Sequence, residues 1–273
     1  MPKVQVNGTE IYYEEHGKGP ETIIFAHGLL WSGRMFDRQV EALKGCFRCI
    51  TFDFRGQGKS EVTASGYDMD TLAEDAACLI KELECGPCNF AGLSMGGFVG
   101  MRLAVRYPDL IKNLILMETS ADPEPKENVS KYKMLNFIAR WFSLKLIADR
   151  IMPIMFGSKF LNDSSRTEEK SLWRNRMIDN NSLGITNAVK GVIERQGIYE
   201  ELDKIKNHTL IIVGDQDTAT PPEKSKRIQE RIPDSELVII PGAGHSSTIE
   251  EPEVVNAVLK EFFKIRQEVE NSK

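Results

Sequence analysis

Short, mostly apolar runs alternate along the chain with longer segments in which apolar residues recur at helical spacing. The runs suit strands buried on both faces, and they lie at 22–26, 49–52, 89–91, 114–117, 210–213 and 237–240. Helical patterns lie near 34–44, 70–84, 95–107, 222–231 and 251–268. This order predicts an α/β fold in which a mostly parallel sheet is flanked by helices.

The first segment of the chain has a different pattern. From Val4 to Glu15, two arms with alternating apolar residues flank Asn7-Gly8. Asn-Gly between such arms is a strong signal for a two-residue hairpin turn. We therefore expect a β-hairpin here, forming an antiparallel edge of the sheet.

The strand–helix alternation is interrupted between residues 122 and 205. That stretch begins with a Pro-containing loop and then carries only helical patterns, rich in Met, Phe and Trp. We predict a helical cap at 122–205, inserted into an α/β core formed by residues 1–121 and 206–273.

Length and charge restrict the classes of function. A chain of 273 residues with 41% hydrophobic and 27% charged residues is typical of an enzyme-sized globular protein. The formal net charge of -5 argues against a nucleic-acid partner. No apolar stretch approaches the roughly 18 residues of a spanning helix, and the N-terminus lacks the apolar core of a signal peptide. We therefore expect a cytoplasmic protein without a membrane partner; its oligomeric state is not predicted.

The five cysteines include two pairs with C-x-x-C spacing, Cys46/Cys49 and Cys85/Cys88. The second pair reads CGPC, like a thioredoxin motif, but a redox pair needs its first thiol at the start of a helix. Here Cys85 follows a helical pattern and Cys88 begins a strand. A structural role is favoured; a zinc site built from both pairs and redox chemistry are the alternatives.

The strongest local signal for chemistry is Gly92-Leu93-Ser94-Met95-Gly96. In a G-x-S-x-G motif the serine lies on a sharp turn from strand to helix, where the glycines allow close backbone approach. An apolar strand pattern precedes this motif and a helical pattern follows it. The context predicts that Ser94 is a nucleophile rather than a serine in a structural turn.

A serine nucleophile needs a base, and the chain has four histidines. His16 lies in a turn, His208 begins a predicted strand, and His27 has the structural role described below. His245 follows the strand 237–240 in a Gly-rich loop, at the sheet edge where α/β proteins form sites. We predict that His245 is the base.

The base in turn needs a carboxylate to orient it. Asp215 and Asp217 both follow the strand 210–213. Asp217 is favoured because it lies farther out on the loop, while Asp215 would remain at the strand end. Glu118, after the strand 114–117, is the outside candidate.

The oxyanion of acyl transfer needs two N–H donors. His27-Gly28-Leu29-Leu30 follows the strand 22–26, and a glycine there allows backbone amides to turn towards the nucleophile. We assign the donors to the N–H groups of Leu29 and Met95. His27 is interpreted as structural, holding this loop by hydrogen bonds.

Together these residues resemble the α/β-hydrolase superfamily over nearly the whole chain. The ordered pieces are His27-Gly28, the 53–60 turn with the sequence DFRGQGKS, the 92–97 elbow, the 214–217 loop and Gly244-His245. The elbow and the 53–60 turn are similar to those of small carboxylesterases, 3-oxoadipate enol-lactonases and cofactor-free haloperoxidases. The resemblance supports Asp217 over Asp215 and the cap, and implies neither metal nor organic cofactor. A Ser rather than an Asp nucleophile argues against epoxide hydrolases and haloalkane dehalogenases.

The predicted function is hydrolysis of a small carboxylic ester through an acyl-Ser94 intermediate, with a small ester or lactone as the partner. A lactonase or C–C bond hydrolase could use the same triad, and a slow, receptor-like hydrolase fold that binds a small ligand is the alternative from another class. The apolar cap suggests a hydrophobic substrate group. The expected substrate-binding residues are Leu30, Trp31, Met134, Phe137 and Trp141.

Overall fold

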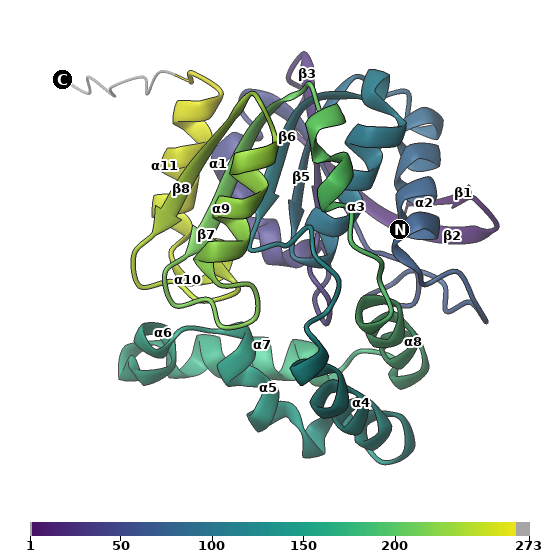
Figure 1. Ribbon diagram of the computed structural model, residues 1–273, viewed down its shortest axis with the longest axis vertical. Helices are drawn as coiled ribbons and strands as arrows, with labels where there is room; N and C mark the ends of the chain where they lie inside the picture. Colours follow the sequence, from purple (N-terminus) through teal and green to yellow (C-terminus); the bar gives the residue numbers. More distant parts are fainter. Residues whose placement is uncertain (1, 266–273) are drawn as a thin grey trace.

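An eight-stranded sheet forms the centre of the computed structural model, which describes residues 2–265 (Figure 1). The strands are β1 (Lys3–Val6), β2 (Thr9–His16), β3 (Glu21–Ala26), β4 (Phe47–Phe52), β5 (Cys88–Leu93), β6 (Ile111–Met117), β7 (His208–Gly214) and β8 (Ser235–Ile240). All six predicted strands are present. The α/β fold class predicted from the sequence is confirmed.

The sheet order is β1-β2-β4-β3-β5-β6-β7-β8. The pairs β1/β2 and β2/β4 are antiparallel, which confirms the predicted N-terminal hairpin at one edge. The remaining neighbours are parallel. Because the carboxyl ends of parallel strands lie at one edge of the sheet, the loops after β3, β5 and β7 come together there.

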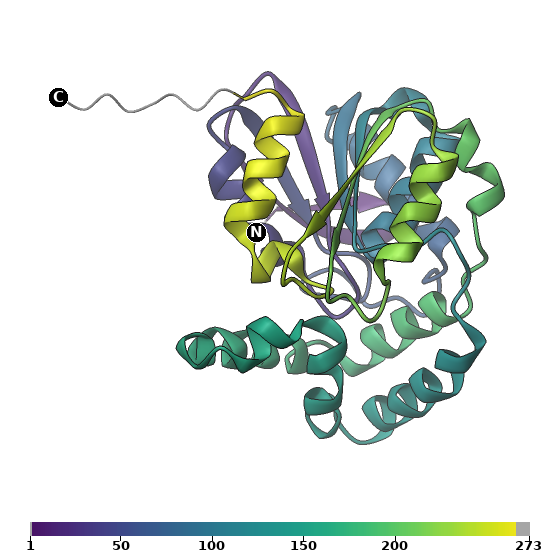
Figure 2. The ribbon, with the colours of Figure 1, turned by 60° about the vertical axis from the view of Figure 1, so that its left-hand side comes forward.

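Helices cover both faces of the sheet (Figures 1 and 2). The helices α2 (Met69–Glu82), α3 (Met95–Arg106) and α9 (Pro222–Arg231) contact the strands from one side. On the other side lie α1 (Asp37–Leu43) and α11 (Pro252–Phe262), which pack on each other, together with the short α10 (Ser247–Glu250). The last predicted helix ends at Phe262; its predicted residues 266–268 lie outside the described residues. Two short 3-10 helices, η1 (Gly33–Phe36) and η2 (Pro108–Leu110), complete the core, and η5 (Tyr199–Lys204), at the end of the predicted cap range, packs against α9 and α3 of the core.

A purely helical segment connects β6 to β7 and lies beyond the loops at one end of the sheet (Figures 1 and 2). It corresponds to the predicted cap, residues 122–205, and we keep that name. Its helices are α4 (Lys126–Trp141), η3 (Leu144–Leu146), α5 (Ala148–Met155), α6 (Ser158–Asn162), η4 (Ser164–Arg166), α7 (Thr167–Ile178) and α8 (Ser182–Ile193).

The cap is joined to the core unevenly. In the α6–η4 part, the Arg166 guanidinium donates to the carbonyls of Ile249 and Glu250, and Lys159 pairs with Glu251 at 2.6 Å. Helix α4 instead bonds to α8, through Asn136 and Arg140. Among the described residues, α4 has no hydrogen bond to the core.

The cysteines lie as their sequence context predicts. Cys85 follows α2 and Cys88 begins β5, so neither thiol is at the start of a helix. Burial raises the pKa of Cys85 to about 11 and also raises that of Cys88, which disfavours the thiolates that redox chemistry requires. All five cysteines are free thiols. Within residues 2–265, no three His, Cys, Asp or Glu side chains are grouped to hold a metal ion.

Candidate active site

Ser94 lies on the turn between β5 and α3, in a backbone conformation that few residues adopt. Its φ is 53° and its ψ is -110°. The turn is tight: a Cβ added at Gly92 would lie 2.2 Å from the carbonyl oxygen of Gly96, and one at Gly96 would lie 2.0 Å from that of Ala26. Only glycine fits at these two positions, and the strained turn presents the serine hydroxyl above the sheet.

The side chains of Ser94, His245 and Asp217 form one hydrogen-bonded chain. His245 Nε2 lies 2.9 Å from Ser94 Oγ, and His245 Nδ1 lies 2.8 Å from Asp217 Oδ2. The three residues come from the loops after β5, β7 and β8. All three are buried, with 8% of Ser94 exposed. This geometry allows His245 to accept the serine proton while its other nitrogen donates to the carboxylate.

The two candidate aspartates in the loop after β7 make different contacts. Asp215 accepts from the Gly242 N–H on the surface and does not reach the histidine. Asp217 accepts from the N–H groups of Ala219 and Thr220, and from the Thr220 hydroxyl at 2.8 Å. Burial acts to raise the pKa of Asp217, but the charge of His245 and these donors outweigh it and lower that pKa. Asp217 is therefore held as an anion towards the imidazole. Thr220 has no motif of its own in the sequence; only its position three residues after an aspartate suggests a turn contact.

Glu118, the outside candidate for the acid, lies directly after β6 and is fully buried. Neither of its carboxyl oxygens has a hydrogen-bond partner among residues 2–265. Burial raises its pKa well above the usual range, and the nearby Asp217 and Glu250 act in the same direction. Burial thus favours the neutral form of Glu118, and Asp217 rather than Glu118 is the group bonded to His245.

Replacement of Glu118 by glutamine is expected to flatten the pH dependence of stability. The pKa of Glu118 is raised in the folded state. As pH rises above the ordinary pKa of a glutamate, the unfolded chain therefore releases a proton that the folded protein still holds. The free energy of unfolding should therefore fall by about 1.4 kcal/mol per pH unit from this group until its folded pKa is reached. Urea unfolding of Glu118→Gln between about pH 5 and pH 8 should lack this slope. An unchanged slope, equal to that of the exposed control Glu253→Gln, would contradict the raised pKa of Glu118.

The loop after β3 lies beside the elbow. A Cβ added at Gly28 would lie 3.5 Å from the Ser94 Cβ, so the backbone of the predicted donor Leu29 runs next to the nucleophile. Met95 begins α3 immediately after Ser94. His27 accepts from the Phe54 N–H at 2.9 Å and contacts the Gly28 carbonyl, as expected for a residue that holds this loop. Burial lowers the pKa of His27, which favours its neutral form.

An apolar pocket of about 130 Å³ opens at Ser94 and His245, between the core and the cap. No Lys, Arg, Asp or Glu side chain lines it. Its walls are Leu29, Leu30, Phe98, Tyr132, Leu135, Asn136, Ala139, Leu144, Ile147, Ile151, Ile154, Met155, Ile185, Val189, Val192, Ile193, Ala219 and Thr220. Such a lining suits a small apolar substrate group.

The structure corrects most of the predicted pocket residues. Leu30 lines the pocket, but Met134, Phe137 and Trp141 point to solvent, with 53%, 58% and 70% of their surfaces exposed. The inward face of α4 carries Tyr132, Leu135, Asn136 and Ala139 instead. The cause is that α4 has apolar residues on two faces, and spacing alone does not say which face is buried.

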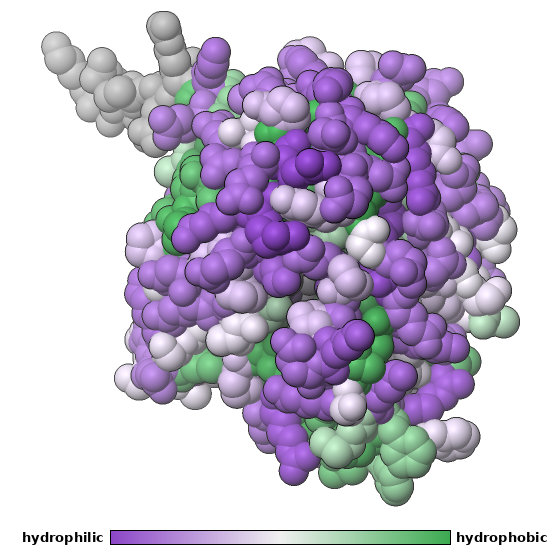
Figure 3. All heavy atoms as spheres, in the orientation of Figure 1, coloured by the Kyte–Doolittle hydropathy of each residue, from purple (hydrophilic) through white to green (hydrophobic). Residues whose placement is uncertain are grey.

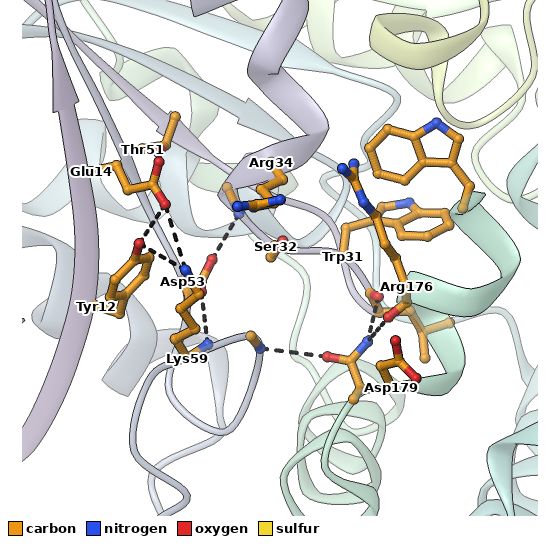
Figure 4. Close-up of a pocket in the computed structure, with 15 residues that line it drawn as sticks. Tyr12, Glu14, Trp31, Ser32, Arg34, Thr51, Asp53, Lys59, Arg176 and Asp179 are labelled. Atoms are coloured by element: carbon orange, nitrogen blue, oxygen red, sulfur yellow. Dashed lines mark hydrogen bonds and ion pairs between the residues drawn. The ribbon is translucent and has the colours of Figure 1, made fainter. Parts of the chain in front are cut away.

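Trp31 lines a different, polar pocket at the junction of cap and core (Figure 4). This pocket has a volume of about 300 Å³ and includes Glu14, Lys59 and Arg176, but neither Ser94 nor His245. Lys59 donates to the Tyr12 hydroxyl at 3.0 Å. The charged residues there are therefore separate from the hydrogen-bonded chain of Ser94.

The profile of the α/β-hydrolase fold matches residues 21–252, which is most of the chain. The chain belongs to the α/β-hydrolase family. It is 31% identical over 256 residues to the AB hydrolase superfamily protein YisY of Bacillus subtilis, which covers 92% of this chain and 94% of that protein. Two solved structures superpose with a TM-score of 0.90: a thermophilic esterase from Thermogutta terrifontis, 29% identical over 97% of this chain and 98% of the esterase, and the enol-lactonase from Burkholderia xenovorans, 27% identical over 96% and 100%.

These similarities place the chain among the hydrolases of the α/β-hydrolase superfamily. Within residues 2–265, no helix is both long and apolar enough to cross a bilayer.

In this α/β hydrolase, one buried carboxylate joins the cap to the histidine loop. Glu250 accepts from the N–H of Gly157, where α6 begins, at 2.8 Å, and from the N–H groups of Gly244 and Ser246 on either side of His245. Burial raises the pKa of Glu250 to about 7, against the effect of these three donors. The sequence shows only a Glu five residues after the histidine.

Replacement of Glu250 by alanine would leave three buried N–H groups without an acceptor. We expect a loss of at least about 3 kcal/mol in the free energy of unfolding. Because the loop positions His245, kcat should also fall, by up to about 100-fold. Urea unfolding and kcat at a temperature where both proteins are folded measure the two effects, with Glu253→Ala on the exposed face of α11 as control. A stability loss without any change in kcat would contradict the positioning of His245.

Proposed function

We propose that this α/β hydrolase is a serine esterase that cleaves small carboxylic esters with a short apolar acyl group. The observation that carries the proposal is the hydrogen-bonded chain from Asp217 through His245 to Ser94, which opens onto an apolar pocket. The similarity to an esterase over nearly the whole chain supports it.

In the first step, Ser94 Oγ attacks the ester carbonyl carbon while His245 Nε2 takes the serine proton. The carbonyl oxygen becomes an oxyanion, and the N–H groups of Leu29 and Met95 are its proposed donors. Collapse of this intermediate breaks the ester C–O bond, and the alcohol leaves with the proton held by His245. Asp217 fixes the imidazole tautomer and stabilises its charged form.

In the second step, water replaces the alcohol in the pocket. His245 removes a proton from the water, whose oxygen attacks the acyl-Ser94 carbonyl carbon. Collapse releases the carboxylic acid and returns the proton to Ser94 Oγ. The same three side chains serve both steps, as two-step acyl transfer requires.

The pocket lining favours an uncharged ester over the enol-lactone of a dicarboxylic acid. The second carboxylate of such a lactone would need a cation or several donors, because burying an unpaired charge is costly. No Lys or Arg lines the pocket. The enol-lactonase similarity makes a neutral lactone the second candidate substrate, since it would use the same acyl chemistry.

The test is hydrolysis of a p-nitrophenyl ester series from acetate to decanoate, together with a neutral lactone and 3-oxoadipate enol-lactone. A pocket of about 130 Å³ is close to the roughly 150 Å³ cavity that holds one benzene molecule. We therefore expect the highest kcat/KM for the short acyl chains and a steep fall for the longest. The carboxylate-bearing lactone should be a poor substrate.

A fluorophosphonate that forms a covalent bond to activated serines provides the second readout. Peptide mass spectrometry should find the label on Ser94, and pre-incubation with the best ester should slow labelling. Labelling without turnover of any ester or lactone would overturn the esterase proposal and favour a receptor-like hydrolase fold. Preference for the carboxylate-bearing lactone would overturn the assigned substrate class.

A further inference from the structure

The outer face of the cap carries large apolar side chains that nothing in the described structure covers. On α4, Met134, Phe137 and Trp141 are spaced at i, i+3 and i+7, so they form one stripe along the helix. Phe142 and Leu146, just beyond α4, continue it with 69% and 66% of their surfaces exposed. We call these five residues the cap stripe. Apolar side chains gather over α4 at the lower end of the molecule in Figure 3.

The cap stripe is not a badly packed part of the core, because α4 already buries its other side. A helix turns by about 100° per residue, so Phe137 and Trp141 lie across the helix axis from Leu135 and Ala139. Leu135 and Ala139 are buried and line the pocket at Ser94. The cap stripe therefore does not contribute to the buried side of α4. An exposed apolar patch of this kind marks a contact surface.

The charge around the cap stripe is opposite in sign to that of the whole chain. Residues 126–150 contain six Lys or Arg and two Asp or Glu, while the formal net charge of the chain is -5. All six basic side chains are exposed: Lys126, Lys131, Lys133, Arg140, Lys145 and Arg150. One of the two acids, Asp149, is paired with Arg174 at 2.7 Å. Lys131, Lys133 and Lys145 have no ion-pair partner among residues 2–265, so their charges are available to an anionic partner.

We propose that the cap stripe docks peripherally on the surface of an anionic phospholipid bilayer. An in-plane helix with Trp, Phe and Leu on one side and Lys and Arg beside them inserts its apolar side chains at the headgroup boundary, while the basic groups bind anionic headgroups. The exposed basic side chains beside the stripe complement an anionic surface, which favours an anionic bilayer as its occupant. That no helix among residues 2–265 is able to span a bilayer bears on insertion across the membrane, not on this surface contact.

Docking would bring the helix that walls the pocket against the bilayer. Leu135 and Ala139 of α4 line the pocket, and Phe137 and Trp141 of the same helix would contact lipid. Apolar esters partition into membranes, so the enzyme would reside where such substrates concentrate. Docking itself requires neither Ser94 nor turnover, and it goes beyond the proposed function.

The test is co-sedimentation of the full chain with vesicles of phosphatidylcholine alone and of an equimolar mixture with phosphatidylglycerol. We expect binding to the anionic vesicles only, decreasing as salt is added because salt screens the contacts. Lys131→Gln/Lys133→Gln should weaken partitioning by about 25-fold, since each basic residue near the surface contributes about 5-fold. Phe137→Ser/Trp141→Ser should weaken it by at least about 10-fold through lost apolar burial.

Matched controls replace apolar residues and lysines that are exposed elsewhere on the surface. Ile239→Ser/Val254→Ser replaces exposed apolar residues of the core, and Lys18→Gln/Lys226→Gln removes two exposed lysines; both should bind as the wild type does. Circular dichroism and the melting temperature verify that each variant is folded.

Three results would overturn the proposal: wild-type protein that stays in solution with anionic vesicles, binding that both cap variants retain, or equal losses in the controls. Sedimentation velocity, which measures the oligomeric state, tests the competing occupant of the stripe, a second copy of the chain. A wild-type dimer that Phe137→Ser/Trp141→Ser converts to a monomer, without vesicle binding, would assign the stripe to a second copy of the chain.

Discussion

Ser94→Ala is expected to lower kcat for the best p-nitrophenyl ester by roughly 10⁶-fold, the scale seen when a serine nucleophile is removed from a complete triad. The 2.9 Å contact between Ser94 Oγ and His245 Nε2 is the reason, because alanine leaves His245 with no hydroxyl to deprotonate. A small residual rate over water should persist from the pocket and the oxyanion donors. Steady-state kinetics over the ester series, with burst amplitudes, is the measurement.

The matched control is Ser246→Ala. Ser246 is also a buried serine and follows His245 in the chain, but its hydroxyl has no hydrogen-bond partner in the described part of the chain. We expect its kcat to remain close to that of the wild type. A Ser94→Ala enzyme that keeps a tenth or more of the wild-type kcat would rule out acyl-Ser94 as the obligatory intermediate.

Asp217→Asn is expected to lower kcat by about 10⁴-fold with little change in stability. The backbone N–H groups of Ala219 and Thr220 would hold the amide oxygen, so the amide NH₂ would face His245 Nδ1. That nitrogen would then accept instead of donate, and the proton would sit on Nε2, where it blocks removal of the Ser94 proton. The loss should appear in kcat rather than in KM.

Asp215→Asn is the control, since Asp215 contacts the Gly242 N–H and not the imidazole. It should retain nearly full activity. A loss of less than 10-fold in Asp217→Asn would overturn its role as the orienting acid. In that case Asp217→Asn/Glu118→Gln would show whether the buried Glu118 replaces it.

The strands and the triad geometry could be predicted because each rests on local patterns. Continuous apolar runs such as 22–26 and 210–213 are buried on both faces, and parallel pairing then brings the loops after them to one edge. Ser94 and His245 lie 151 positions apart in the chain, yet each lies within the few residues that follow a predicted strand. The topology, rather than a long-range signal, places them within hydrogen-bond distance.

The pocket could not be predicted because it depends on the rotation of α4. Tyr132, Leu135, Asn136 and Ala139 are spaced at i, i+3, i+4 and i+7, and so are Met134, Phe137, Ile138 and Trp141. Both stripes are apolar enough to face a core. Only the packing of α4 against α8 and η3 decides which one closes the pocket.

Glu250 and Thr220 were missed for another reason. Each acts on backbone or side-chain groups that the fold brings near, and neither residue type is diagnostic of a site. Glu250 bonds to Gly157, which is 93 positions away in the chain. Contacts of this kind have no sequence pattern in a single chain.

The uneven attachment of the cap has a consequence for how substrate reaches Ser94. Opening on the α6–η4 side would break the bonds of Arg166 to the 249–250 carbonyls and that of Glu250 to Gly157, whereas lifting α4 breaks no hydrogen bond to the core. Local opening follows the lowest free-energy cost, so α4 is the part of the cap whose amide hydrogens should exchange fastest. The entrance for the ester then lies beneath α4, which apolar contacts hold against the core and which Asn136 and Arg140 bond to α8.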